Sequence, residues 1–113
     1  MVNISSERSK GILIIKINGE IDASSSIHLD NELGSALNSN KKILIDCTGL
    51  DYISSAGLGV FMSYIHEMEE KRIKMILFGM STKVKNVFQF LGLDQLLKIV
   101  DSSEEATNLL NAV

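Results

Sequence analysis

The fold is decided by one stretch of the sequence, Asp46-Cys47-Thr48-Gly49-Leu50-Asp51-Tyr52-Ile53-Ser54-Ser55-Ala56-Gly57-Leu58-Gly59-Val60. It begins after the aliphatic run at residues 43–45, which is typical of a strand buried on both faces. Its two serines stand directly before residues 57–71, where apolar side chains recur at helical spacing. The start of a helix exposes backbone N–H groups that lack intrahelical partners, so a hydroxyl or a phosphate placed there meets ready-made donors. We therefore expect the working site at this junction of strand and helix.

The rest of the chain alternates between strand-like and helix-like patterns. Short aliphatic or β-branched runs predict strands, and Asn18-Gly19 is a turn signal after the second of them. Serines predict helix starts, and Ser102 with Glu105 has the spacing of a capping box. Strands are expected at residues 2–6, 12–17, 43–45, 73–78 and 96–100, with the first two joined as a hairpin about residues 9–11. Helices are expected after the serines at 24–26, over residues 57–71, after Ser81 or Thr82 as far as Gly92, and after Ser102 to the end of the chain.

Apolar residues at helical spacing predict which face of each helix packs on the sheet. In chain order these residues are Leu29, Leu33, Ala36 and Leu37; Leu58, Phe61, Met62, Ile65 and Met68; Val84, Val87, Phe88 and Leu91; and Ala106, Leu109, Leu110 and Val113. The element order β, β, α, β, α, β, α, β, α predicts an α/β fold with right-handed crossovers. We expect a mixed, mostly parallel sheet of about five strands with about four packed helices, in one domain over residues 1–113.

Composition excludes several classes of function. The 113 residues are 45% hydrophobic and 22% charged, as in an ordinary globular protein, with a formal net charge of −3. Acidic and basic residues are interspersed, so there is no basic footprint for nucleic acid, and no aliphatic run approaches the roughly 20 residues that span a bilayer. The single cysteine, Cys47, cannot form an internal disulfide, and the first residues lack a secretory signal pattern. We expect a soluble cytoplasmic protein that needs no cofactor.

Residue chemistry gives no support to catalysis or to metal binding. Cys47 has no histidine or basic residue nearby in the sequence to lower its pKa, and it is expected to be a small buried group. His28 and His66 lie on separate predicted helices without metal-ligand spacing. The sequence has no phosphate-binding loop, dinucleotide fingerprint or hydrolase elbow, and nothing supplies Ser55 with a general base. The chain is expected not to be an enzyme.

The polar residues at the junction have alternative roles that the residues alone leave open. Serine is among the best N-cap residues, so Ser55 could cap the helix, or Ser54 could cap it while Ser55 faces solvent. Asp22 could line the site, or it could satisfy N–H groups of the turn before Ala23-Ser24. No charged side chain occurs between residues 52 and 65. Such a smooth, uncharged surface suits the docking of a partner protein.

Residues 46–60 resemble the signature of the STAS domains, above all that of the bacterial anti-sigma factor antagonists, in which an Asp-Ser-Ser/Thr-Gly-Leu-Gly loop carries a serine phosphorylated by a partner kinase. Aligned on Gly57-Leu58-Gly59, the phosphorylated serine falls on Ser55, with Ser54 as the alternative. The chain departs from the pattern at Ser54, where the family has aspartate, and at Ala56, where a second serine or threonine would follow. Gly19-Glu20-Ile21-Asp22 also resembles the family's segment after the second strand, and the element order agrees over nearly the whole chain.

This resemblance implies a regulatory binding module. An unphosphorylated antagonist would bind an anti-sigma factor or a related serine kinase and so free a sigma factor; phosphorylation of Ser55 would switch it off, and a phosphatase would reset it. The partner-binding residues that the resemblance implies are Asp22, Ser54, Ser55, Ala56, Gly57, Leu58 and Gly59. Two alternatives keep the fold without the switch. One is a scaffold subunit of a stress-signalling or lipid-transport complex, and the other is a small-molecule or nucleotide sensor that binds an anion at the loop.

Overall fold

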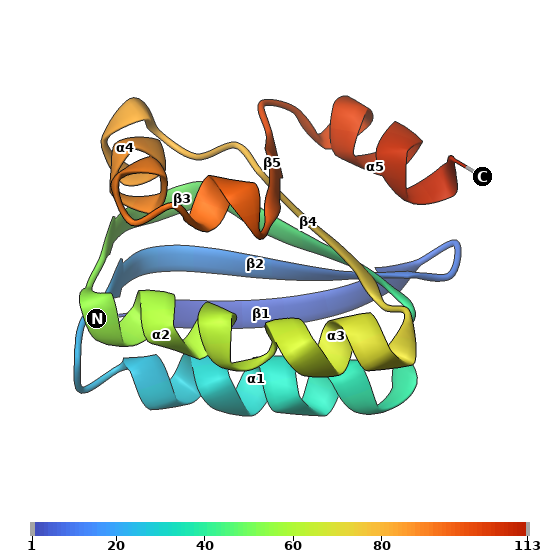
Figure 1. Cartoon of the computed structure of the whole chain (residues 1–113), viewed down its shortest axis with the longest axis horizontal. Coiled ribbons are helices and arrows are strands. Elements are labelled where there is room, and N and C mark those ends of the chain that lie inside the picture. The colour runs from blue at the N-terminus through green and yellow to red at the C-terminus, as the bar shows by residue number, and fades with distance from the viewer. Residues whose placement is uncertain (1, 113) are drawn as a thin grey trace.

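One five-stranded sheet forms the centre of the protein, whose computed structural model describes residues 2–112. The strands follow the order β1-β2-β3-β4-β5 (Figure 1). β1 (Val2–Ser9) and β2 (Ile12–Ile21) form an antiparallel hairpin. β3 (Lys42–Ile53), β4 (Lys74–Phe78) and β5 (Lys98–Val100) then continue the sheet from β2 in parallel. The predicted α/β class, the hairpin and the mostly parallel sheet are confirmed.

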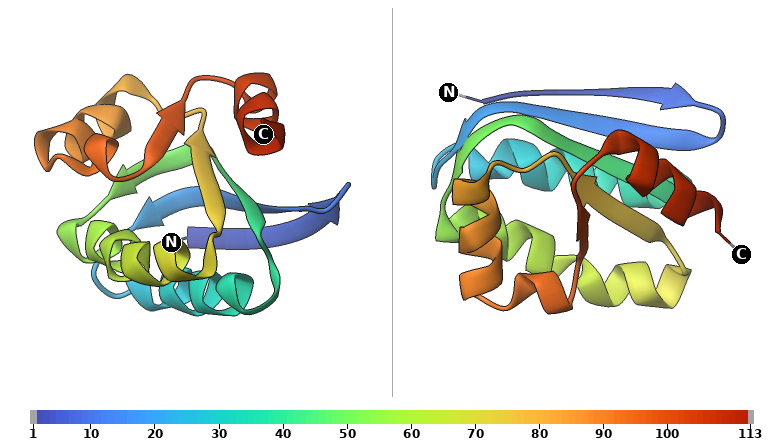
Figure 2. Two further views of the ribbon diagram at one scale, coloured as in Figure 1. Left: turned by 45° about the vertical axis from the view of Figure 1, so that its right-hand side comes forward. Right: turned by 90° about the horizontal axis from the view of Figure 1, so that it is seen from above.

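Helices cover both faces of this sheet. α1 (Ser26–Ser39), α2 (Ser55–Ser63) and α3 (Ile65–Lys71) run along one face, and α5 (Ser103–Asn111) lies on the opposite one (Figures 1 and 2). α4 (Thr82–Phe90) and the 3₁₀ turn η1 (Leu93–Gln95) lie together near β5. The larger hydrophobic core takes side chains from the sheet, α1 to α4 and η1, and a smaller core lies under α5.

The caps and buried faces of most helices are those that the sequence predicts. Leu29, Leu33, Ala36 and Leu37 are the buried residues of α1. Ser81, rather than Thr82, caps α4, because its Oγ accepts a hydrogen bond from the Val84 N–H at 3.2 Å. Ser102 caps α5 in the same way, with the Glu105 N–H as donor at 3.1 Å. Val113, predicted on the apolar face of the last helix, lies outside the described residues.

Two strands run further than the sequence predicts. β2 does not turn at Asn18-Gly19 but continues to Ile21, because Gly19, at φ 101°, lets the strand bend through register shifts on either side. β3 does not give way to a loop after residue 45 but continues to Ile53 against the extended end of β2. Cys47, Leu50 and Ile53 are buried and hold the segment on the core, and their spacing of three residues, in place of strict alternation, accompanies the register shifts between β2 and β3. The expected loop is thereby reduced to the single residue Ser54 between β3 and α2.

The predicted helix over residues 57–71 is broken at Tyr64 into α2 and α3. Phe61 and Met68 are buried as predicted, but Met62 is 51% exposed and was wrongly placed on the buried face. The same error occurs at Leu91, which follows the last residue of α4 and is also 51% exposed. Met62 lies within α2 and Leu91 is the C-cap of α4, and the core packs against only part of each side chain.

Candidate functional site

The candidate site lies at the carboxyl ends of β2 and β3, where α2 begins. Ser54 has an extended backbone, and its Oγ accepts a hydrogen bond from the Gly57 N–H at 3.3 Å, so Ser54 is the N-cap of α2. Its own N–H donates to the Ile21 carbonyl at 2.8 Å, which fixes the start of α2 to the end of β2. Ser55 is therefore the first residue of the helix, and its side chain is exposed. The structure thus separates the two serines into a cap and a solvent-facing hydroxyl.

Gly57 and Leu58 are buried and position the first turn of α2 on the sheet. Leu58 is 1% exposed and belongs to the main core. Gly57 is buried as well, and a Cβ at its position would lie 2.8 Å from the side chains of both Ile21 and Ile53. Only glycine lets the first turn of α2 approach the sheet so closely. Of the residues expected to contact a partner, these two are inside the protein and would act through the shape that they give to α2.

The exposed face of α2 is uncharged. Ser55, Ala56, Gly59, Met62 and Ser63 are all exposed, and they recur at intervals of three and four residues along the helix. At Gly59 an added Cβ would have no atom within 4 Å, so the surface is open there. Three of the expected contact residues, Ser55, Ala56 and Gly59, therefore lie on one accessible stripe. Met62 extends this stripe by almost a turn, and sequence analysis missed it because its spacing also fits the buried face.

Asp22 forms a rigid polar turn beside this junction. Its Oδ1 accepts hydrogen bonds from the Ser24 hydroxyl at 2.9 Å, the Ser25 N–H at 2.8 Å and the Ser25 hydroxyl at 2.9 Å. These donors, the Ser25 backbone first, lower the pKa of Asp22 from 3.8 to about 2, so the carboxylate stays ionised. Asp22 follows directly after Ile21, whose carbonyl binds Ser54. The contacts of Asp22 stabilise the turn into α1. The same turn places a negative charge at the carboxyl ends of the strands, where α2 begins with Ser55.

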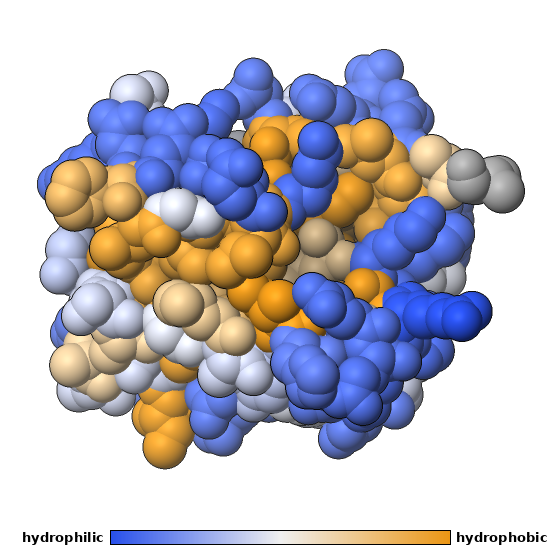
Figure 3. All heavy atoms as spheres, viewed as in Figure 1, coloured by the Kyte–Doolittle hydropathy of each residue, from blue (hydrophilic) through white to orange (hydrophobic). Residues whose placement is uncertain are grey.

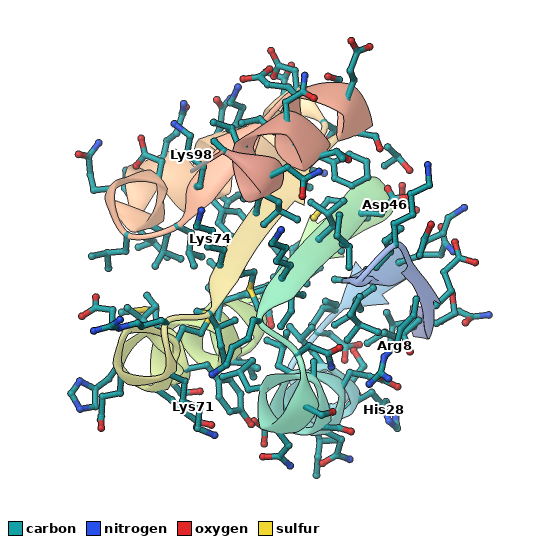
Figure 4. All side chains as sticks on the ribbon, turned by 90° about the vertical axis from the view of Figure 1, so that its right-hand side faces the viewer. Arg8, His28, Asp46, Lys71, Lys74 and Lys98 are labelled. Carbon is teal, nitrogen blue, oxygen red and sulfur yellow. The ribbon has the colours of Figure 1, made fainter. Side chains whose placement is uncertain are left out.

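The other candidates from the sequence have structural roles. Cys47 is fully buried, and burial raises the pKa of its thiol to about 12, so it is no nucleophile. His66 pairs with Glu70 on the surface of α3, at 2.6 Å between Nε2 and Oε1. His28 points outward from α1, away from Asp46 (Figure 4). Within residues 2–112 no group of three His, Cys, Asp or Glu side chains could hold a metal ion, and no helix there is long and apolar enough to cross a membrane.

Basic side chains gather at the other end of the molecule. Lys71 ends α3 and Lys74 begins β4, at the end of the molecule that lies on the right of Figure 1, whereas α2 begins on the left (Figures 1 and 4). Lys74 Nζ donates to the Ala112 carbonyl at 3.0 Å, and Lys41 Nζ donates to the Lys71 carbonyl at 2.7 Å. Lysines at these places stabilise the ends of α5 and α3, where carbonyl groups lack helical partners. Neither of these bonds involves a residue of the candidate site.

Comparison with known proteins gives the same family as this geometry. The sequence model of the STAS domain family matches residues 3–106, so the chain belongs to this family. The anti-sigma-B factor antagonist of Listeria monocytogenes is 30% identical over 94 residues, which cover 82% of each chain.

Solved structures with the same fold include an anti-sigma factor antagonist from Mycobacterium paratuberculosis, with a TM-score of 0.90 at 16% identity over 99% of this chain and 96% of that one. Another is the Bacillus cell fate determinant SpoIIAA in its phosphorylated form, with a TM-score of 0.72 at 22% identity over 96% of this chain and 100% of that one.

Proposed function

We propose that this protein is an anti-sigma factor antagonist whose binding to an anti-sigma factor kinase is switched off by phosphorylation of Ser55. The observation that supports the proposal is that Ser54 and Ser55 have different structural roles. Ser54 Oγ caps α2, while Ser55 is exposed on the first turn and, within residues 2–112, makes no side-chain hydrogen bond. A kinase can reach this hydroxyl without unfolding the site. The relatedness to a named anti-sigma-B factor antagonist supports the same role.

The chemistry of the switch follows from the uncharged surface of α2. A kinase would transfer the terminal phosphoryl group of ATP to Ser55 Oγ, with ADP as the leaving product and the hydroxyl proton taken up by the kinase. The new group carries about −1.5 to −2 charges at neutral pH. The free N–H groups of the first turn stabilise it in the isolated protein. In a complex, the same charge would lie among exposed Ala56, Gly59 and Met62, where desolvation opposes binding.

Phosphorylation therefore changes affinity without a change of fold. The rigid base of the site favours this, because Ser54 is bonded to Ile21 and Gly57 is packed against Ile21 and Ile53. A phosphatase that removes the group would restore binding. The protein would then act in the cytoplasm as a partner switch and control transcription indirectly.

The test is displacement of a sigma factor. An anti-sigma factor kinase of the same genome is loaded with its sigma factor, and this chain is added in its unphosphorylated form and in its phosphorylated form. We expect the unphosphorylated protein to release the sigma factor on a size-exclusion column and the phosphorylated protein to leave the complex intact. If neither form binds the kinase, the proposal is wrong, and a pull-down would then separate the scaffold role from a small-molecule or nucleotide sensor.

A further inference from the structure

Four large apolar side chains are exposed on neighbouring elements of one side of the protein. Phe90 is 90% exposed, Leu96 57%, and Met62 and Leu91 51% each. They belong to α2, to the end of α4 and to the residue after η1. Figure 3 shows a band of apolar surface between α4 and η1 on one side and α2 and α3 on the other. We call these four residues the apolar patch. An exposed apolar surface of this kind on a small domain marks a site of interaction.

The patch is built on a rigid base that it shares with the candidate site. The buried rings of Phe61 in α2 and Phe88 in α4 are in contact, with centroids 5.9 Å apart. Gly92, at φ 75°, reverses the chain after α4 and returns it to the core at Leu93, which is fully buried. The helix end and η1 are therefore held in place from below, and the patch cannot be hidden by a side-chain movement alone.

The patch supplies large apolar side chains, which the start of α2 lacks. The exposed residues at that start, Ser55, Ala56 and Gly59, have small side chains, and serine and alanine are depleted in protein interfaces. Aromatic side chains and methionine are enriched in protein interfaces, and a few large, well-packed side chains provide most of the affinity. Ser55 can carry a switch, but strong binding needs larger contacts. Met62 connects the two surfaces, because it lies seven residues after Ser55 on the same exposed face of α2.

We propose that the apolar patch is a second contact surface for the same anti-sigma factor that binds around Ser55, and that it supplies most of the affinity while Ser55 supplies the control. This inference rests on the proposed function. The partner's matching surface is apolar, since the patch itself offers no charge. The anti-sigma factor is the occupant because the patch is continuous through Met62 with the exposed stripe of α2 that carries Ser55, so that one partner can cover both surfaces. Joined to the α2 stripe, the same four side chains form the centre of a larger surface.

The experiment compares Phe90→Ser and Leu96→Ser with Ile27→Ser. Ile27 on α1 is the matched control, because it is an aliphatic residue 58% exposed, against 57% for Leu96. The three variants and the wild type are titrated calorimetrically with the purified anti-sigma factor kinase of the same genome. We expect each patch variant to bind roughly 10-fold to 30-fold more weakly, as for a residue at the centre of an interface, and Ile27→Ser to bind like the wild type. Thermal melting should be unchanged in all three, because each side chain is exposed.

The outcomes separate this inference from the proposed function. If Ser55→Asp weakens binding and the two patch variants do not, the patch is no contact and the inference is wrong while the switch stands. Equal losses in Ile27→Ser and the patch variants would also overturn it. If wild-type protein dimerises in sedimentation and Leu96→Ser does not, the patch belongs to a second copy. If the wild type does not bind the kinase, the proposed function fails first and the inference fails with it.

Discussion

The Tyr64 hydroxyl donates a hydrogen bond to the Asp30 carboxylate, with Oη and Oδ1 2.6 Å apart. Tyr64 stands at the break between α2 and α3, and Asp30 lies in α1, so the bond ties together neighbouring helices on one face of the sheet. The hydroxyl fills the space beside Gly34, where an added Cβ would lie 2.9 Å from Oη. The same bond, ahead of burial, raises the pKa of Tyr64 to about 12, so the phenol remains a donor at any physiological pH.

Replacing Tyr64 with Phe should therefore destabilise the protein by about 1 to 2 kcal/mol, because the Asp30 carboxylate loses a donor in a half-buried place. Urea denaturation at neutral pH measures the change. The control is Tyr52→Phe, since Tyr52 is 44% exposed and its hydroxyl makes no side-chain hydrogen bond within the described residues. Equal stabilities of the two variants would mean that the Tyr64 bond contributes nothing.

Gly57 and Gly59 form a matched pair on the first turns of α2. Gly57→Ala should cost about 1 to 3 kcal/mol, because the new methyl group meets Ile21 and Ile53 at 2.8 Å. Gly59→Ala should instead stabilise the protein by up to about 1 kcal/mol, because the site is open and alanine is the better helix former. Urea denaturation measures the free energy of unfolding of both variants. A Gly57→Ala variant as stable as Gly59→Ala would show that Gly57 is not held by close packing.

Asp22 gives the protein a defined sensitivity to acid. Its folded-state pKa of about 2 lies below the unfolded value of 3.8, so its contribution to stability is present above pH 3.8 and is lost as the pH falls from there toward 2. Thermal melting of wild type and Asp22→Asn should therefore differ at pH 6 and converge near pH 2. A difference that is constant with pH would assign the role of Asp22 to its shape rather than its charge.

The two serines differ in what their loss should do. After incubation with the anti-sigma factor kinase and ATP, mass spectrometry should find one phosphate on the segment around Ser55. Ser55→Ala should abolish it, and Ser54→Ala should retain it while losing about 0.5 to 2 kcal/mol of stability, because Ser54 is the cap. A phosphate found on Ser54 alone would contradict the assignment of these roles.

The parts of the fold that were predictable are those encoded by neighbouring residues. Ser81 and Ser102 cap their helices through bonds that span three residues, and the buried face of α1 follows from spacing along one helix. The candidate site was predictable for the same reason, since Ser54 and Gly57 are three residues apart. The division of roles between Ser54 and Ser55, the burial of Gly57 and Leu58 and the exposure of Met62 needed the structure.

What could not be predicted depends on partners distant in sequence. Residues 46–52 contain loop-forming residues, yet they form a strand because β2 lies beside them. The break at Tyr64 depends on a bond to Asp30 across 34 residues. Met62 and Leu91 are apolar and fit the helical period, but each is 51% exposed within residues 2–112. Their exposure is a tertiary property, and it is the one that points to a partner.

Charge at position 55 should separate folding from binding. Ser55→Asp places a carboxylate on the first turn of α2, where the helix dipole favours it by roughly 0.3 to 1 kcal/mol, so the melting temperature should hold or rise. In a complex the same charge would be desolvated among uncharged residues at a cost on the order of 2 to 3 kcal/mol, which is about 30-fold to 150-fold in affinity. Calorimetric titration of wild type, Ser55→Asp and the phosphorylated protein against the kinase measures both effects. The phosphorylated protein should show the larger defect, because aspartate reproduces only part of the charge of phosphate.

Ser55→Asn is the uncharged control of similar size and should bind nearly as well as the wild type. Equal affinities for all these forms, with folding intact, would remove Ser55 from the interface and leave it as an ordinary residue of the first turn.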